Sequence, residues 1–256
     1  MSNRQTALQV LGLIDLTSLR GDETAEEIQA LCRKGHTPYG DVAAICVYPA
    51  HVATAMRELI EIGALNVQVA TVVNFPSGNE PVDQVVSQTR QAIDEGADEI
   101  DLVLPYQSLM QGDEAHVVAM LNAVQQVCAE RAQLKVIIES GELASDALIA
   151  RACELVIASG AQFIKTSTGK VPVNATPQAA AVMLNAIRAS NVAVGFKASG
   201  GIRSVDDAGE YIAMAAARMG DEWVTPAHFR FGASGLLDDV LGQLGLQTKQ
   251  EAAYVY

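Results

Sequence analysis

The amino-acid sequence predicts a single-domain α/β protein folded as a (β/α)₈ barrel, or TIM barrel, that takes in residues 1–256. Short apolar runs alternate with longer amphipathic runs eight times along the chain, and no Pro-, Gly- or Ser-rich linker separates them. Such alternation indicates a parallel sheet covered by helices, and eight units in about 250 residues favour closure into a barrel. An open, doubly wound sheet remains the alternative, but no G-x-G-x-x-G motif follows the first expected strand.

The expected strands are the short apolar runs, in which small and β-branched side chains are plentiful. In chain order they are Gly12–Thr17, Val42–Val47, Val67–Val73, Glu99–Leu104, Leu134–Glu139, Gln162–Thr166, Val192–Lys197 and His228–Gly232.

Each strand is followed by a stretch that opens with residues typical of helix starts, either a side-chain cap or a proline suited to the first turn. The expected helices run from Asp22 or Thr24 to Arg33, from Pro49 to Ile62, from Pro81 to Glu95, from Gly112 and Asp113 to Arg131, from Ser145 to Ser159, from Thr176 and Pro177 to Ser190, from Ser204 or Asp206 onward, and from Ser234 to Leu244. We expect residues 245–256 to form a flexible C-terminal tail.

Composition and charge narrow the class of function. Half of the residues are hydrophobic, which excludes a disordered chain, and the formal net charge of −13 disfavours nucleic acid and anionic membranes as partners. The N-terminal segment lacks the apolar stretch of a signal peptide, and no run approaches the length of a membrane span. Cys32, Cys46, Cys128 and Cys153 show no metal-ligand spacing, so we expect reduced thiols, no metal and a cytoplasmic location.

Polar side chains stand near the carboxyl ends of several expected strands, where barrel enzymes place their active sites. These residues are Asp15, Cys46, Asp101, Glu139, Lys165 and Lys197. Because side chains alternate along a strand, an inward Lys165 requires an inward Phe163 and leaves Ile164 facing the helices. By the same rule Gly195 faces inward if Lys197 does.

Two lysines at the ends of neighbouring strands indicate amine chemistry. Two ammonium groups about 4 Å apart repel each other by about 4 kcal/mol at an effective dielectric near 20, which favours loss of one proton. A neutral amine is the form that attacks a carbonyl. Asp101 would then hold Lys197 charged and leave Lys165 neutral. The alternative is that both lysines are ordinary ion-pair partners of nearby acids.

Three neighbouring loops indicate a phosphate site. Thr166–Lys170, Ser199–Arg203 and Gly232–Gly235 each follow an expected strand directly and are rich in glycine and hydroxyl side chains. Glycines let the backbone approach a ligand closely, and backbone N–H groups near a helix start suit an anion. Lys170 and Arg203 add charge. The alternative is that these are plain turns between strands and helices.

The chain also resembles a known family, the 2-deoxyribose-5-phosphate aldolases of the cytosolic bacterial type. The resemblance rests on segments that span almost the whole chain in order: Ile14–Thr17, Ala44–Pro49, Val73–Asn79, Ala97–Asp101, Val136–Glu139, Phe163–Gly169, Gly195–Arg203 and Arg230–Ser234. The two lysine segments are its most specific part.

The resemblance implies a (β/α)₈ class I aldolase, a carbon–carbon lyase that needs no metal and no other cofactor. It implies reversible cleavage of a phosphorylated sugar, 2-deoxy-D-ribose 5-phosphate, into acetaldehyde and D-glyceraldehyde 3-phosphate, a step of deoxyribonucleoside catabolism. Lys165 would form the Schiff base, Lys197 would lower its pKa, and Asp101 would work with Lys197 and a water in proton transfer, supported by Asp15. The implied substrate-binding positions are Thr17, Cys46, Thr168, Gly169, Lys170, Gly200, Gly201, Arg203, Gly232 and Ser234.

Two features depart from the family pattern or leave a choice open. Many relatives carry a second serine after Gly-Ala-Ser, whereas this chain has Gly235, which removes one hydroxyl donor. Relatives also end in a segment whose final tyrosine enters the active site. Tyr256 is the expected counterpart here, Tyr254 is nearby, and an idle tail is the alternative.

Several readings remain open at this point. A Schiff-base aldolase acting on another pair of aldehydes and a non-catalytic sugar-phosphate-binding protein are the competing functions. The sequence does not decide the oligomeric state, and a homodimer is one expectation. Glu99 and Lys135 are expected to pair inside the lower barrel in a stabilising role.

Overall fold

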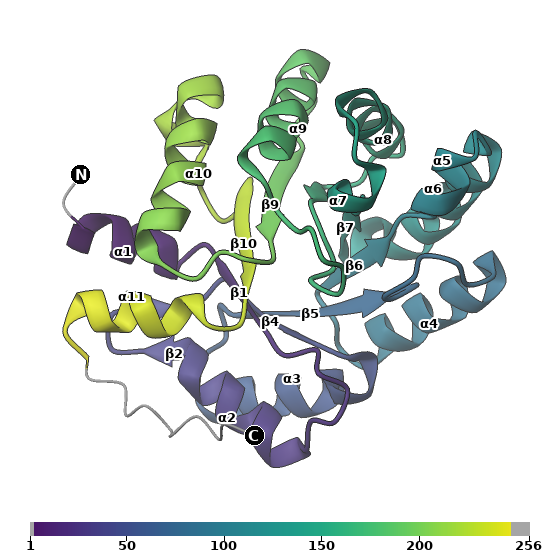
Figure 1. Cartoon of the computed structure of the whole chain (residues 1–256). Coiled ribbons are helices and arrows are strands. Elements are labelled where there is room, and N and C mark those ends of the chain that lie inside the picture. The colour runs from purple at the N-terminus through teal and green to yellow at the C-terminus, as the bar shows by residue number, and fades with distance from the viewer. Residues whose placement is uncertain (1–2, 247–256) are drawn as a thin grey trace.

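A closed barrel of eight parallel strands forms the centre of the computed structural model, which describes residues 3–246 (Figure 1). Around the barrel the hydrogen-bonded order is β1-β10-β9-β8-β7-β6-β5-β4, and β4 pairs with β1 to close it. The strands are β1 Ile14–Thr17, β4 Ala44–Val47, β5 Gln68–Val73, β6 Glu99–Val103, β7 Gln133–Ile137, β8 Phe163–Lys165, β9 Gly195–Ser199 and β10 Phe229–Ala233. The predicted (β/α)₈ barrel is therefore confirmed.

Helices surround the barrel and connect its strands (Figure 1). They are α1 Asn3–Leu11, α2 Ala25–Gly35, α3 Val52–Glu61, α4 Val82–Asp94, α5 Tyr106–Met110, α6 Glu114–Cys128, α7 Ser140–Leu143, α8 Asp146–Ala158, α9 Pro177–Ser190, α10 Val205–Met219 and α11 Leu236–Leu244. Thr24 and Ser204 form capping boxes, and Ser145 and Thr176 cap α8 and α9 with their hydroxyl groups. The predicted helix starts depended on this same chemistry.

The structure differs from the sequence prediction mainly in short elements. Helix α1 and the hairpin of β2 His36–Thr37 and β3 Gly40–Asp41 were not expected, and neither were α5 and α7. The turns η1 Pro49–His51, η2 Ala129–Arg131 and η3 Asp221–Trp223 are 3₁₀ helices. Elements of two to five residues leave too little periodicity to be recognised, and α1 has only three buried residues in nine. Strand β9 begins three residues later than expected.

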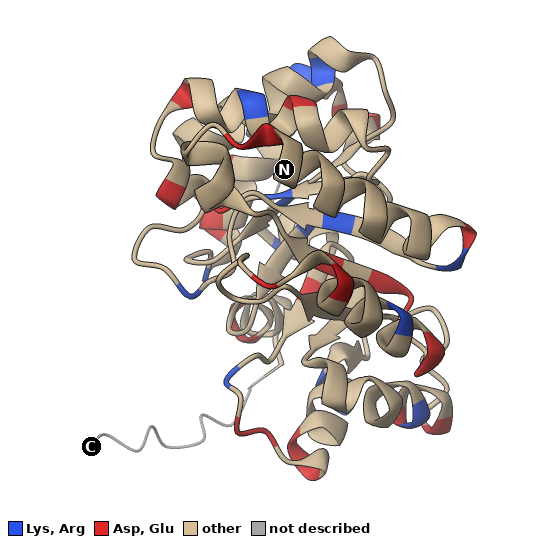
Figure 2. Cartoon of the chain, turned by 90° about the vertical axis from the view of Figure 1, so that its right-hand side faces the viewer, with Lys and Arg blue, Asp and Glu red and all other residues tan. Residues whose placement is uncertain are grey.

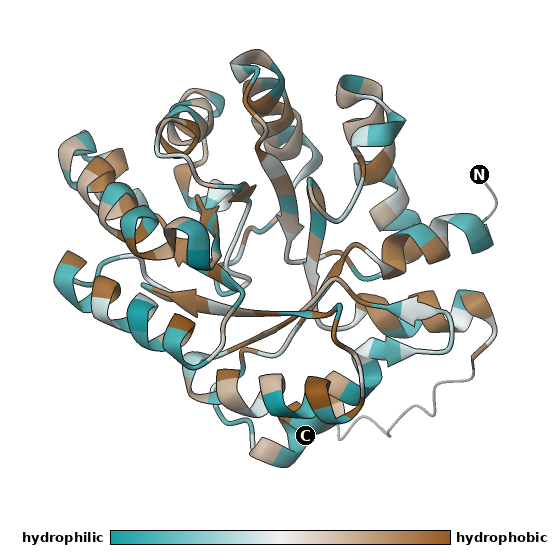
Figure 3. Cartoon of the chain, turned by 180° about the vertical axis from the view of Figure 1, so that it is seen from behind, coloured by the Kyte–Doolittle hydropathy of each residue, from teal (hydrophilic) through white to brown (hydrophobic). Residues whose placement is uncertain are grey.

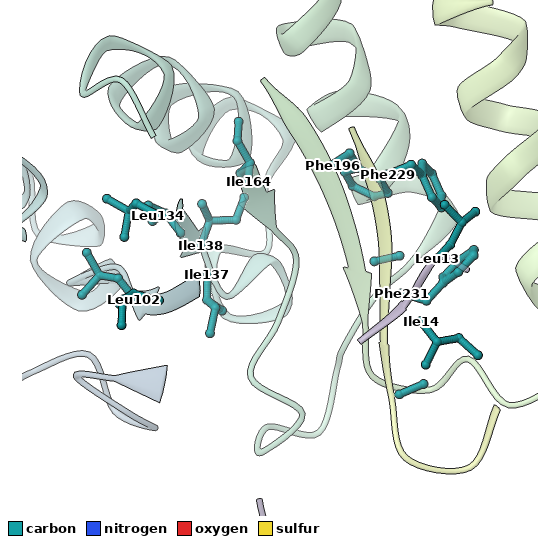
Figure 4. Close-up of a cluster of buried hydrophobic side chains, with 14 of the residues drawn as sticks. Leu13, Ile14, Leu102, Leu134, Ile137, Ile138, Ile164, Phe196, Phe229 and Phe231 are labelled. Atoms are coloured by element: carbon teal, nitrogen blue, oxygen red, sulfur yellow. The ribbon is translucent and has the colours of Figure 1, made fainter. Parts of the chain in front are cut away.

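The apolar core lies between the barrel and the helices rather than inside the barrel. Phe196, Phe229 and Phe231 belong to it, with ring centroids 5.7 Å and 5.0 Å apart along the series (Figure 4). Helices turn hydrophobic residues toward this layer and hydrophilic residues outward (Figure 3). Ile164 is also part of the core, whereas its neighbours Phe163 and Lys165 point into the barrel, as strand alternation predicts.

The barrel interior is instead rich in charge, although charged residues also lie at scattered positions on the outer helices (Figure 2). Within residues 3–246, none of the helices combines the length and the apolar character that a membrane span requires.

Gly195 tests this division of the barrel. A Cβ at this position would lie 2.5 Å from Phe163 Cε1 inside the barrel, so Gly195→Ala should lower the free energy of unfolding by about 1–3 kcal/mol through overpacking. Gly209→Ala in α10 is the matched control, because its Cβ would meet the Thr6 methyl at an ordinary 3.6 Å. The control should gain about 0.5–1 kcal/mol from helix propensity. Urea unfolding measures both, and an unchanged Gly195→Ala protein would contradict the described packing.

Candidate active site

The barrel encloses a cluster of buried ionisable side chains, each at most 5% exposed, which six strands bring together from far apart in the sequence. Its members are Asp15 on β1, Glu99 and Asp101 on β6, Lys135 on β7, Lys165 on β8, Lys197 on β9 and Arg230 on β10. Four bases thus face three acids. Because a buried charge is costly without a partner, the cluster is closest to neutral when one base gives up its proton.

Asp101 joins the two lysines that the sequence singled out. Its Oδ2 accepts hydrogen bonds from Lys165 Nζ at 2.7 Å and from Lys197 Nζ at 2.8 Å. Lys197 Nζ also donates to Asp15 Oδ2 at 2.5 Å. The strand register explains this closeness, since Lys165 and Lys197 are direct neighbours on β8 and β9. The structure therefore brings together all four of these predicted residues.

The surroundings of the two amino groups push their pKa values in opposite directions. Burial lowers the pKa of Lys165, Asp101 opposes this effect, and the positive charge of Lys197 lowers it further. Burial also acts on Lys197, but the carboxylates of Asp101 and Asp15 outweigh it and raise the pKa of this lysine. Lys165 is thus the base most easily deprotonated. The sequence reasoning relied mainly on repulsion from Lys197, whereas burial has the larger effect.

Lys135 and Arg230 support the acids from within the barrel. Lys135 Nζ donates to Asp15 Oδ2 at 2.9 Å and to Glu99, so the expected Glu99–Lys135 pair is present but belongs to the larger cluster. Arg230 donates to Asp15 Oδ1 at 2.6 Å and to Glu99 Oε1 at 3.0 Å. Sequence reasoning assigned Arg230 no role. An arginine within the mostly apolar expected strand His228–Gly232 could have indicated a buried ion pair.

Asp101 retains one oxygen for further interactions. Among the described residues, its Oδ1 accepts no hydrogen bond, although Lys135 Nζ lies 3.4 Å away as an ion-pair partner. The pKa values of Asp101 and Asp15 both lie below the usual range, because the surrounding cations outweigh the effect of burial. Both acids are therefore carboxylates. Cys46 on β4 is buried nearby, and burial followed by the charge of Asp101 raises the pKa of its thiol.

A cavity of roughly 720 Å³ lies at the carboxyl ends of the strands. It is lined by the three predicted phosphate loops and by the loop after β1: Thr17, Ser18, Leu19, Arg20, Thr168, Gly169, Lys170, Asn174, Ser199, Gly200, Gly201, Ile202, Arg203, Gly232, Ala233, Ser234 and Gly235. All the predicted substrate-binding residues except Cys46 are among them. The β1 loop and Asn174 were missed, because their segments contain no Gly-rich signal, whereas Ser199 belongs to the predicted loop Ser199–Arg203.

The lining residues carry positive charge and leave room for a ligand. Arg20, Lys170 and Arg203 contribute cations, and no Asp or Glu among residues 3–246 lines the cavity. Gly200 has φ 85°, and a Cβ there would lie 2.6 Å from Asn174 Cβ, so this close approach needs glycine. Helix α11 starts directly after Gly235, which adds the backbone N–H groups of a helix start. An anion suits this cavity better than a cation does.

Two expectations concern other parts of the site. Residues 3–246 contain no group of three or more His, Cys, Asp and Glu side chains arranged to hold a metal ion. Tyr256 and Tyr254 lie outside the described residues, as does the expected tail beyond Leu246. Gly245, at the start of that expected tail, ends α11 in a left-handed conformation.

A closed parallel barrel with paired lysines and a cation-lined cavity at its carboxyl end defines a (β/α)₈-barrel enzyme. A family model described as DeoC/LacD family aldolase matches residues 9–241, and the chain belongs to this family. It is therefore an aldolase, a carbon–carbon lyase.

Individual relatives agree with this assignment. The chain is 51% identical to a deoxyribose-phosphate aldolase from Agrobacterium fabrum over 99% of this chain and 97% of that protein. It is 29% identical to a proposed deoxyribose-phosphate aldolase from Coccidioides immitis, whose crystal structure matches with a TM-score of 0.78 over 91% of this chain and 86% of that one. The deoxyribose phosphate aldolase from Aeropyrum pernix, described as tetrameric, is 25% identical, with a TM-score of 0.74 and coverage of 94% and 96%.

Replacing the second lysine tests the electrostatic coupling. In Lys197→Met the pKa of Lys165 should rise, because a neighbouring cation is lost and Asp101 is left to Lys165. NMR titration of ¹³C-labelled lysine side chains measures this pKa directly. Lys34→Met, which removes a lysine paired with Asp238 on the protein surface, should leave it unchanged. If the pKa of Lys165 is the same in Lys197→Met as in the wild type, the two amino groups are not coupled.

Proposed function

We propose that this protein is a class I aldolase that reversibly cleaves 2-deoxy-D-ribose 5-phosphate into acetaldehyde and D-glyceraldehyde 3-phosphate. The observation that carries the proposal is the pairing of Lys165, which burial favours as a neutral amine, with Lys197, which two carboxylates hold charged. The 51% identical relative from Agrobacterium fabrum, a deoxyribose-phosphate aldolase, and the cation-lined cavity support this choice of substrate. The pathway would be deoxyribonucleoside catabolism.

Lys165 would act as the nucleophile. Its neutral amine attacks the aldehyde carbon C1, and loss of water gives a protonated imine. The imine withdraws electrons, so the C2–C3 bond breaks when a base removes the C3 hydroxyl proton. Glyceraldehyde 3-phosphate leaves, and the electron pair remains as an enamine on Lys165. Protonation of the enamine carbon and hydrolysis release acetaldehyde and restore the amine. No cofactor is required, because the imine itself accepts the electrons.

Asp101 and Lys197 would move the protons. Asp101 Oδ1 has acceptor capacity left, and Lys197 is a charged donor bonded to the same carboxylate. Together with a water they can accept the C3 proton and return one to the enamine. Asp15 keeps Lys197 in place and charged. We also propose that Cys46 lines the inner pocket as a neutral thiol and that Tyr256 assists proton transfer.

The phosphate would bind in the cavity, at a distance from the reacting carbon. Lys170 and Arg203 supply charge, Gly169, Gly200, Gly201 and Gly232 let the backbone approach, and Thr168 and Ser234 supply hydroxyl groups. Thr17 lines this cavity, and its hydroxyl donates to the backbone carbonyl of Asp15 at 2.9 Å. At Gly235 the backbone N–H would take the place of the missing hydroxyl. Binding energy at the phosphate then positions the reacting end. A cytoplasmic location and a homodimer complete the proposal.

Reductive trapping tests the proposed nucleophile. Incubation with acetaldehyde and borohydride should add one ethyl group, located on Lys165 by peptide mass spectrometry. Lys165→Arg should prevent the adduct and lower kcat by roughly 10⁵–10⁶-fold, as expected when a covalent nucleophile is removed. Lys170→Arg is the control, because it keeps the charge in the cavity and should still be trapped. An adduct on another lysine would refute the mechanism, and trapping without cleavage of 2-deoxy-D-ribose 5-phosphate would indicate another pair of aldehydes.

A further inference from the structure

The loop that follows β1 forms one side of the cavity, and one buried carboxylate holds its backbone. Glu23 is 8% exposed. Its Oε1 accepts hydrogen bonds from Ser18 Oγ at 2.6 Å and from Arg20 N at 2.7 Å, and its Oε2 accepts one from Gly21 N at 2.8 Å. The carboxylate thereby fixes the turn of residues 18–21, of which Ser18, Leu19 and Arg20 line the cavity.

This turn carries a carbonyl that contacts the lysine of the opposite loop. Lys170 Nζ donates to Leu19 O at 2.5 Å, although the two residues are 151 positions apart. The backbone of the same loop is held as well, since Lys170 N donates to Thr168 Oγ1 at 3.0 Å. An ammonium group has three donors, so the Leu19 carbonyl can hold Lys170 in place and leave donors for a ligand.

The Leu19 side chain fixes the turn from its other side. It is 7% exposed and packs in a small apolar cluster with Ala44, Cys46, Ala70 and Val72. The carbonyl of Leu19 therefore cannot follow Lys170 freely, because both its side chain and the next residue's N–H are tied down. A fixed acceptor restricts where a long, flexible lysine side chain places its charge.

The charge of Glu23 is an integral part of this arrangement. Burial opposes the charged form, but the hydrogen bonds from Ser18, Arg20 and Gly21 outweigh it and lower the pKa of Glu23 to about 2. Three donors converge on the two oxygens. A glutamine at this position would present an NH₂ group to one of these donors, so at least one hydrogen bond would be lost.

We propose that Glu23 is a positioning residue for the phosphorylated substrate: by holding the turn of residues 18–21 it places the Leu19 carbonyl that sets Lys170 toward the phosphate. The inference rests on the proposed function, and it assigns to Glu23 an effect on phosphate binding without contact to the substrate. Its distinguishing consequence is that Glu23 matters only when the ligand carries a phosphate.

The test compares Glu23→Gln with Glu26→Gln, which removes the same charge from the exposed first turn of α2. For 2-deoxy-D-ribose 5-phosphate, Glu23→Gln should raise KM about tenfold, the effect of losing one charge-assisted hydrogen bond, with kcat within about twofold of the wild type. For unphosphorylated 2-deoxy-D-ribose, kcat/KM should be unchanged. Glu26→Gln should match the wild type with both sugars.

A fall in kcat/KM by the same factor for both sugars, or an unchanged KM for the phosphorylated sugar, would overturn the inference. If Glu23→Gln does not fold, Glu23→Asp keeps the charge on a shorter side chain and should give a smaller rise in KM, again only with the phosphorylated sugar. Calorimetric binding of inorganic phosphate gives a readout that needs no turnover, and the Kd should rise about tenfold in Glu23→Gln. Loss of phosphate affinity in that variant would support the inference even if the wild type failed to cleave the deoxy sugar phosphate.

Discussion

The structure of the site depends on one shared oxygen atom, Oδ2 of Asp101, which accepts hydrogen bonds from both Lys165 and Lys197. A buried carboxylate can compensate about one cation, so two ammonium groups on one oxygen leave an excess of positive charge. Lys197 has a second carboxylate in Asp15, whereas Lys165 has an ion pair only with Asp101 within the described chain. The excess is therefore relieved most easily at Lys165. Unequal access to carboxylates thus distinguishes two lysines that the sequence presents as equivalent.

The inner layer of the barrel keeps this distinction stable. Lys135 and Arg230 both contact Asp15 and Glu99, and their positive charges, with that of Lys197, keep the pKa of Asp15 below its usual range. If Asp15 took up a proton, Lys197 would lose one of its two carboxylate partners. The pKa of Lys197 would then fall toward that of Lys165. Lys135 and Arg230 therefore contribute to the asymmetry without contacting Lys165 in the described structure. A role in stability alone, as expected from the sequence, describes only part of what Lys135 does.

Sequence reasoning succeeded where a property is local. The eight strands were found because each is a short, mostly apolar run, and helix starts such as Thr24 were found because capping needs particular side chains. The contact of Arg230 with Asp15 was not found, because the residues are 215 positions apart and meet only when β10 pairs with β1. The β1 loop was missed for a similar reason: Leu19 becomes part of the site only through Lys170 on the far side of the cavity.

The net charge of −13 and the cation-lined cavity are compatible because they act over different distances. Surface charges are screened beyond about 8–10 Å at physiological salt, so a phosphate inside the cavity responds mainly to Arg20, Lys170, Arg203 and backbone N–H groups. Strand β8 runs from Lys165 directly into the loop that holds Thr168, Gly169 and Lys170. A phosphate held at Lys170 is therefore held relative to the Lys165 amine by a few residues of fixed backbone. In the proposed mechanism, phosphate binding at one end of the substrate therefore orients the aldehyde carbon at the other end toward Lys165.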